Sequence, residues 1–120
     1  MSPAPIGSLL LGSSNVDAMK SWYRQAFDTT ENEGGAFEFG PVQLFIEEHS
    51  EISGPTAEPA RSIINLDVDD CRAIEAQLNG AGVTWLRPVE LMPFGLIGTV
   101  VDPDGNLIQV IQWGATEDGG

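Results

Sequence analysis

The apolar residues of this chain predict the same order of elements twice, and this repeat limits the possible folds more than any other feature. In each half, one strand and one amphipathic helix precede three further strands, so the pattern is βαβββ in tandem. The 120 residues are enough for a single domain, 1–120, with a packed core. The repeat therefore predicts an α+β fold in which two four-stranded sheets, each with one helix on its outer face, form a cupped pair.

The first module is expected over residues 6–49. Residues 6–11 form a short apolar strand, and Asn15 is suited to cap the helix that follows. The apolar residues of this helix recur at spacings of three and four: Val16, Met19, Tyr23, Ala26 and Phe27. Polar residues 28–33 are expected to form an edge strand, and residues 36–39 and 42–48 form two more strands.

The second module is expected over residues 61–114, after a linker at residues 50–60 and before a tail at residues 115–120. A strand over 62–68 leads to a helix that Asp69 and Asp70 can cap and that Gly82 ends. Cys71 opens this helix, where either the helix dipole lowers the pKa of its thiol or the residue is a small buried side chain. Three strands are then expected over 83–89, 95–101 and 107–113.

A turn at Asp102-Pro103-Asp104-Gly105-Asn106 joins the last two strands. Pro103 presets φ, and Asp104-Gly105 tolerates tight or left-handed geometry, so the apolar segments on both sides form a hairpin. The strand after the turn carries Gln109 among apolar residues. A buried amide costs about 1–3 kcal/mol unless it is hydrogen-bonded, so Gln109 requires a partner.

Three segments resemble the vicinal oxygen chelate superfamily, which includes glyoxalase I, bleomycin-resistance proteins and extradiol dioxygenases. They are residues 15–23, Val68-Asp69-Asp70 and the turn at residues 102–106. The resemblance covers residues 6–113 and implies two βαβββ modules around a shared cleft, usually in a homodimer with clefts at or near the interface. The fold hosts many chemistries, so function has to be argued from the site.

The resemblance also implies where metal-binding members carry their ligands. Those positions correspond to Ser8, Gln43, Ile63 (or Ser62, one residue earlier) and Gln109. Isoleucine has no donor atom, and hydroxyl and amide oxygens are weak ligands for a transition ion. His49 and Glu47 are too few for a typical site, so we expect a metal-free member without a cofactor.

The same positions predict a ligand-binding cleft. If Gln109 faces inward, so do Ile111 and Trp113, and if Gln43 faces inward, so do Phe45 and Glu47. Further cleft residues are expected from neighbouring segments: Ser8, Leu10, Phe39, Trp85 and Phe94. An apolar, aromatic cleft with a few amides and a carboxylate suits an organic ligand. Alternatively, the aromatic residues are core, and Gln43 and Gln109 bond each other across a dry interior.

Charge and targeting signals narrow the partners. Five basic and 18 acidic residues give a net charge of −13, which repels nucleic acid and attracts cations, or serves only solubility. The chain has no run of 18 apolar residues and begins without a basic segment followed by an apolar one, so we expect no membrane contact and no signal peptide. The single cysteine fits a cytoplasmic location.

Three functions stay open at this point. The favoured one is a metal-free protein that sequesters an aromatic or cationic small molecule in the cleft. The second is an isomerase or lyase that uses Glu47, Glu90 or His49 as a proton carrier, so enzymatic activity is undecided and Glu47 is the candidate catalytic residue. The third is a scaffold whose cleft is filled by its own side chains.

Overall fold

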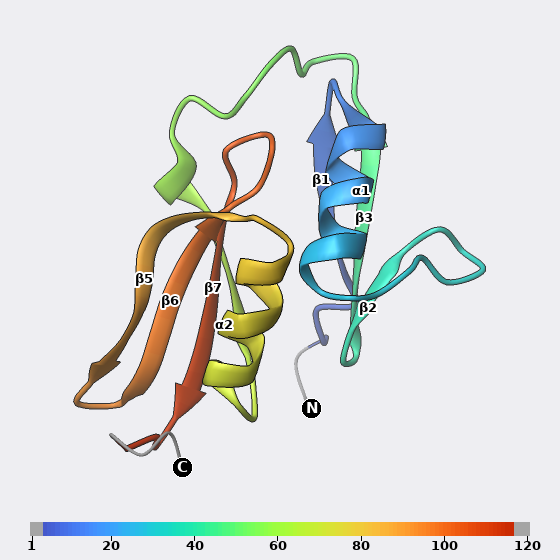
Figure 1. Ribbon diagram of the computed structural model, residues 1–120. Coiled ribbons are helices and arrows are strands. Elements are labelled where there is room, and N and C mark those ends of the chain that lie inside the picture. The colour runs from blue at the N-terminus through green and yellow to red at the C-terminus, as the bar shows by residue number, and fades with distance from the viewer. Residues whose placement is uncertain (1–3, 117–120) are drawn as a thin grey trace.

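A computed structural model describes residues 4–116 of the chain. The first module contains β1 (Ser8–Ser13), α1 (Val16–Ala26), β2 (Phe37–Phe39) and β3 (Val42–Glu48). Its strands form a three-stranded sheet in the order β1-β3-β2 (Figure 1), with β1 parallel and β2 antiparallel to β3.

The second module follows a short 3-10 helix, η1 (Pro59–Arg61). It contains β4 (Ile63–Asp67), α2 (Cys71–Gly80), β5 (Thr84–Met92), β6 (Gly95–Val101) and β7 (Leu107–Trp113). These strands form a four-stranded sheet in the order β4-β7-β6-β5. The predicted α+β class, with two related modules in tandem, is confirmed. Of the expected tail, residues 117–120 lie outside the described residues.

The edge strand expected over residues 28–33 is not formed. Its backbone groups bond locally: Asn32 N donates to Ala36 O at 2.8 Å, and Gly35 N donates to Asn32 O at 3.0 Å. The Asn32 side chain reinforces this turn, because its Oδ1 accepts from Gly34 N and Ala36 N, both at 3.0 Å. An asparagine that bonds the backbone two residues ahead competes with strand pairing, so this prediction was wrong.

The two helices begin differently. Asp70 caps α2 as expected, with Oδ1 accepting from Ala73 N at 3.1 Å. Asn15 occupies the cap position of α1, but its side chain makes no capping bond, and its N–H donates instead to Ser13 Oγ at 2.9 Å. Cys71 is a buried side chain with a free thiol, and burial raises its pKa.

One core is built from the helix-covered faces of both sheets. Met19 and Tyr23 of α1 and Leu44 of β3 belong to the same buried cluster as Leu78 of α2 and Val110 of β7. In Figure 1, α2 stands between the four-stranded sheet and the first module. The sheet faces without helices therefore lie on the outer sides of the chain, and we call them the open faces.

This packing corrects the expectation of a shared cleft within one chain. Leu11 of β1 and Ile64 and Leu66 of β4 pack against the common core. Because these side chains are apolar and neither module's helix covers them completely, the two modules bury them by bringing their helix sides together. Residues on the open faces, such as Gln43 and Gln109, consequently do not meet.

A buried hydrogen bond joins the two modules. Tyr23 Oη of α1 donates to Asp102 Oδ2 of the β6–β7 hairpin at 2.8 Å. Burial raises the pKa of Asp102, although the hydrogen bonds from Asn106, Tyr23 and Asp104 oppose the rise. Burial, followed by the negative charge of Asp102, holds the pKa of the Tyr23 phenol far above its usual range. The first helix is therefore tied to the hairpin that the sequence singles out.

Tyr23 is the only tyrosine, so its ionisation can be followed directly. We expect no tyrosinate absorbance at 295 nm from folded protein at about pH 11, whereas the guanidinium-unfolded chain titrates near pH 10. The unfolded chain loses this proton and the folded chain keeps it, so the stability contributed by Tyr23 is complete below about pH 10 and falls above it. Titration of the folded protein near pH 10, with the circular dichroism unchanged, would contradict the buried bond.

Candidate functional site on the open faces

Strand alternation places the glutamine of β7 on the open face of the second sheet. Val110 points into the core, and Gln112 Oε1 on the same side accepts from Cys71 N at 2.7 Å. Gln109, Ile111 and Trp113 therefore lie on the opposite, open face, as their spacing predicts. In the parallel ladder with β4, Asn65 pairs with Gln109 and Asp67 with Ile111, so their side chains share this face.

The Gln109 amide is held by two neighbouring side chains. Its Nε2 donates to Asn65 Oδ1 at 2.7 Å, and its Oε1 accepts from Thr99 Oγ1 at 3.1 Å. Thr99 is buried, and its hydroxyl lies on the β6 strand directly opposite Gln109. Three adjacent strands thus carry a row of bonded polar groups across the open face.

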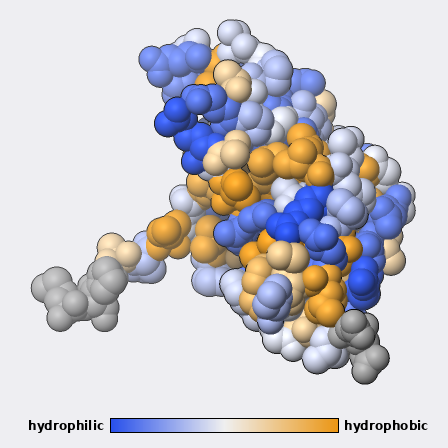
Figure 2. All heavy atoms as spheres, turned by 90° about the vertical axis from the view of Figure 1, so that its left-hand side faces the viewer, coloured by the Kyte–Doolittle hydropathy of each residue, from blue (hydrophilic) through white to orange (hydrophobic). Residues whose placement is uncertain are grey.

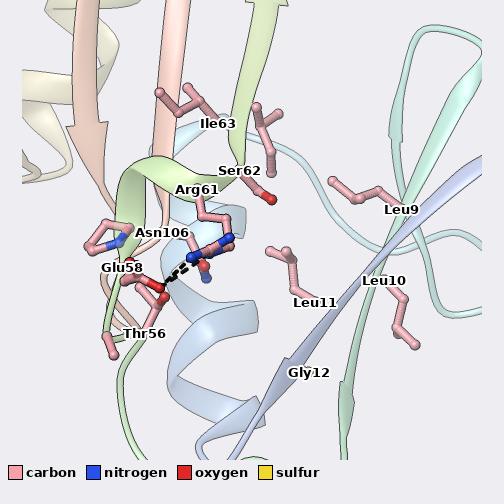
Figure 3. A pocket seen from close by; sticks show the side chains of 13 residues that line it. Leu9, Leu10, Leu11, Gly12, Thr56, Glu58, Arg61, Ser62, Ile63 and Asn106 are labelled. Carbon is pink, nitrogen blue, oxygen red and sulfur yellow. Dashed lines mark hydrogen bonds and ion pairs between the residues drawn. The ribbon is translucent and has the colours of Figure 1, made fainter.

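On the first sheet too, residues that are paired between neighbouring strands share one face. The parallel register pairs Ser8 with Gln43, Leu10 with Phe45 and Gly12 with Glu47, which places all six residues on one face. Figure 3 shows Leu9 and Leu11 pointing into the groove between β1 and the linker, whereas Leu10 points away from it. The inward-facing set predicted for this sheet therefore shares one face, with Phe39 as the exception.

Gln43 has a partner that sequence reasoning missed. Asn32 Nδ2 donates to Gln43 Oε1 at 3.3 Å and to Glu38 Oε1 at 3.1 Å. Because Asn32 Oδ1 already accepts two backbone N–H groups, only its NH2 can face Gln43, and the Gln43 amide is oriented with Nε2 on the other side. The alternative of a bond between Gln43 and Gln109 is not formed, because the amide of each residue bonds to side chains of its own module. The sequence did carry a signal for this turn, because an asparagine shortly before Gly34-Gly35 is typical of a turn.

An exposed aromatic pair lies near the end of the second sheet. The rings of Phe94 and Trp113 are 5.3 Å apart between centroids, and their side chains are 39% and 60% exposed. Trp113 Nε1 donates to Asp67 Oδ1 at 2.9 Å, which places a carboxylate beside the indole. Figure 2 views the molecule from the side of β5 and shows apolar and hydrophilic side chains mixed on that surface.

Two predicted site residues lie on the helix-covered faces instead. Phe39 packs edge-on against Phe27, with ring centroids 5.5 Å apart. Trp85 pairs with the fully buried Val100, and its Nε1 donates to Asn79 Oδ1 of α2 at 2.8 Å. Both residues were assigned to the wrong face. The sequence did not show which side chains of β2 and β5 point toward the helices, so the alternation along these strands could not be given a direction.

The candidate proton carriers are separate. Glu47 is exposed on β3, Glu90 of β5 forms an ion pair with Arg87 at 2.6 Å, and His49 Nδ1 accepts from Glu51 N at 3.2 Å. No hydrogen bond or ion pair within residues 4–116 joins any two of these three side chains. Within the described residues, these three side chains therefore do not form an acid–base pair.

The residues at the family's metal positions do not fit a metal ion. Ile63 has no donor atom, and the amides of Gln43 and Gln109 are engaged by side chains of their own modules. Across the described part of the chain, no group of three or more His, Cys, Asp and Glu side chains is placed to hold a metal. Neutral oxygens alone are poor ligands for a transition ion.

Comparison with known proteins assigns the family. Residues 6–110 match the Glyoxalase/Bleomycin resistance protein/Dioxygenase superfamily, and the chain belongs to this superfamily. No relative was found among curated proteins. In residues 4–116, no helix is long and apolar enough to span a membrane.

Solved structures share the fold at low sequence identity. A glyoxalase/bleomycin resistance protein/dioxygenase family enzyme from Burkholderia phytofirmans PsJN has 18% identity and a TM-score of 0.72, over 92% of this chain and 99% of that one. TnmS3, an antibiotic-binding protein from Streptomyces sp. CB03234, has 19% identity and a TM-score of 0.69, over 94% and 98%. Lactoylglutathione lyase from Agrobacterium tumefaciens has 18% identity and a TM-score of 0.68, over 93% and 96%.

The polar row predicts the effect of removing the Gln109 amide. In Gln109→Leu, the buried Thr99 hydroxyl loses its partner, so we expect the free energy of unfolding in urea to fall by about 1–3 kcal/mol. Gln77→Leu, which removes an exposed amide bonded to Gln25 O on α1, serves as the control and should cost less than about 0.5 kcal/mol. Equal stability of the Gln109→Leu variant and the wild type would show that the row does not stabilise the sheet.

Proposed function

We propose that the chain is a metal-free binding protein that holds an aromatic, cationic organic molecule against its open faces. The observation that carries this proposal is the exposed Phe94–Trp113 pair with the Asp67 carboxylate beside it. Aromatic rings stack on flat ligands, and a carboxylate next to an indole favours a positive charge above the ring. The net charge of −13 raises the local concentration of cations around the protein.

The amides supply orientation in this proposal. Asn32 directs the Gln43 Nε2 hydrogens away from itself, so Gln43 offers donors to a carbonyl or ether oxygen of the ligand. Gln109, Phe45 and Ile111 complete the expected contact residues on the two open faces, together with Ser8 and Leu10. The carboxylates of these faces at Glu38, Glu47, Asp67 and Glu90 are exposed, so none has the burial that favours a general base. We therefore propose binding rather than isomerase or lyase activity.

A second copy of the chain would complete the cleft. β1 and β4 are the outer strands of their sheets and lack the usual protection of Lys or Pro, and Leu10 on β1 is 52% exposed. The other long edge, β5, carries Pro88 and two register shifts that discourage pairing. In a homodimer that covers β1 and β4, the open face of one copy's first module would stand beside the second module of its partner.

The comparisons are compatible with this proposal. TnmS3, which shares the fold, is an antibiotic-binding protein, so a binding role occurs on this scaffold. A cytoplasmic location is part of the proposal and fits the single free cysteine, which is buried.

The ligand chemistry can be tested with 9-aminoacridine, an aromatic cation, and with acridine, which has the same shape and is neutral at pH 8. We expect 9-aminoacridine to quench the tryptophan fluorescence and to bind more tightly than acridine. Trp113→Ala should weaken its binding about threefold to tenfold, because stacking is lost. Leu86→Ala, an exposed change on β5 of the same sheet, should not alter the affinity. The proposal fails if both probes leave fluorescence and melting temperature unchanged.

The assembly can be tested by sedimentation equilibrium. Leu10→Lys places a charge on the unprotected β1 edge, so we expect the dimer dissociation constant to rise at least about tenfold. Leu86→Lys is the matched control, because Leu86 is 63% exposed on the protected β5 edge, and it should remain dimeric. A monomeric wild type, or equal effects of the two variants, would contradict the proposed interface.

A further inference from the structure

A small apolar cavity lies between the two modules on their helix-covered sides. Its volume is about 160 Å³. The walls come from β1, α1, β2 and β3 of the first module and from β4 and β7 of the second: Leu9, Tyr23, Phe39, Val42, Leu44, Ile64, Asn65, Leu66 and Ile108. The hydroxyl of Tyr23 is bound to Asp102 and the Asn65 amide to Gln109, so the cavity is enclosed mainly by hydrocarbon.

This inner cavity adjoins a wider pocket at the surface. The outer pocket has a volume of about 590 Å³ and shares Phe39, Asn65 and Leu66 with the cavity. Asp28, Glu38 and Asp67 line the outer pocket, and neither wall contains Lys or Arg. The inner cavity, which we call the chamber, therefore borders the outer pocket, which we call the vestibule and whose charged lining residues are all acidic.

We propose that the chamber and the vestibule, which together we call the seam, form a second binding site. Its ligand would be an organic ammonium ion that carries one compact apolar group. A cavity of about 150 Å³ is large enough for a benzene ring, so the chamber accepts a phenyl group or a short branched alkyl group. The ammonium group stays in the vestibule, where carboxylates favour it and water still solvates it. Charge selects the ligand at the mouth, and shape selects it inside.

The seam is distinct from the site on the open faces. Gln43, Phe45, Gln109, Ile111 and Trp113 line neither the chamber nor the vestibule. Glu38, Asn65 and Asp67 touch both regions, but the side chains of Asn65 and Asp67 bond to Gln109 and Trp113 on the open side. The two sites can therefore be perturbed separately.

The test uses 2-phenylethylammonium as the probe and the neutral 2-phenylethanol and the anionic 3-phenylpropionate as matched controls. Methyl NMR spectra of the full chain should show shifts at Leu9, Val42, Leu44, Ile64, Leu66 and Ile108 with the ammonium probe. We expect affinity in the order ammonium, alcohol, carboxylate, and a narrower gap at 0.5 M salt. Shifts confined to open-face methyls such as Ile111, or no shifts with up to 10 mM probe, would overturn the proposal. A second copy of the chain that fills the seam would produce no shifts with any of the three probes.

Variants separate the chamber from its mouth. Leu66→Phe fills the chamber and should reduce probe binding at least about tenfold, whereas Ile63→Phe, on the open side of the same strand, should not. Asp28→Asn should weaken the ammonium probe about twofold to fivefold and leave the alcohol unchanged. Asn tolerates the positive φ of 49° at this position, so the backbone is kept.

Equal binding of 2-phenylethylammonium to the Leu66→Phe variant and the wild type would overturn the seam site. Binding of 9-aminoacridine serves as the readout for the open faces and should survive Leu66→Phe. Should that variant not fold, the methyl shifts in the wild-type protein decide the question alone.

Discussion

The arrangement of the two modules depends on the hydrogen bonds that the carboxylate of Asp102 accepts. It accepts hydrogen bonds from Tyr23 Oη, Asp104 N, Asn106 N and Asn106 Nδ2, all between 2.8 and 2.9 Å. Three of these bonds shape the hairpin between β6 and β7, and the fourth reaches the helix of the other module. A buried carboxylate is costly without such partners. The same group therefore defines the turn and locates the first module against the second.

The local elements were predictable because each has its own signal in the sequence. The capping aspartate of α2, the spacing of apolar residues in α1 and the Pro-Asp-Gly turn all acted over a few residues and formed as expected. Gln109, Ile111 and Trp113 could be grouped on one face because β7 is a regular strand of seven residues, in which every second side chain points the same way. The register of β2, only three residues long, had no such anchor, and Phe39 was placed on the wrong face.

What could not be predicted depends on contacts between distant segments. The turn around Asn32 competes with a strand through side-chain bonds that alternation does not encode. Trp85 was misplaced because β5 contains register shifts, so counting residues along it does not preserve the face. The meeting of the two helix-covered faces results from leftover apolar surface on β1 and β4, which is a property of the whole chain. The sequence therefore reveals the modules more readily than the way in which they pack.

Amides at two metal positions change what the scaffold can do. A carboxylate at position 109 would carry a negative charge that can bind a cation, whereas Gln109 is neutral and its amide is bonded to Thr99 and Asn65. In the proposed function, the open face is accessible to an organic molecule without a metal to hold it. Stacking surfaces and oriented donors are sufficient for binding, because neither has to polarise a bond.

The unprotected edges of β1 and β4 also determine how far assembly can proceed. Each chain has one such edge on each module, so two copies related by a twofold axis can cover all four edges at once. The proposed assembly is then closed, and no uncovered β1 or β4 edge is left to recruit a third copy, while the remaining edge of the first sheet, β2, is only three residues long. The protected edge of β5, with Pro88 at its centre, faces outward from such a pair and ends the growth of the sheet. The distribution of edge protection along the chain would therefore favour a finite particle over a fibre.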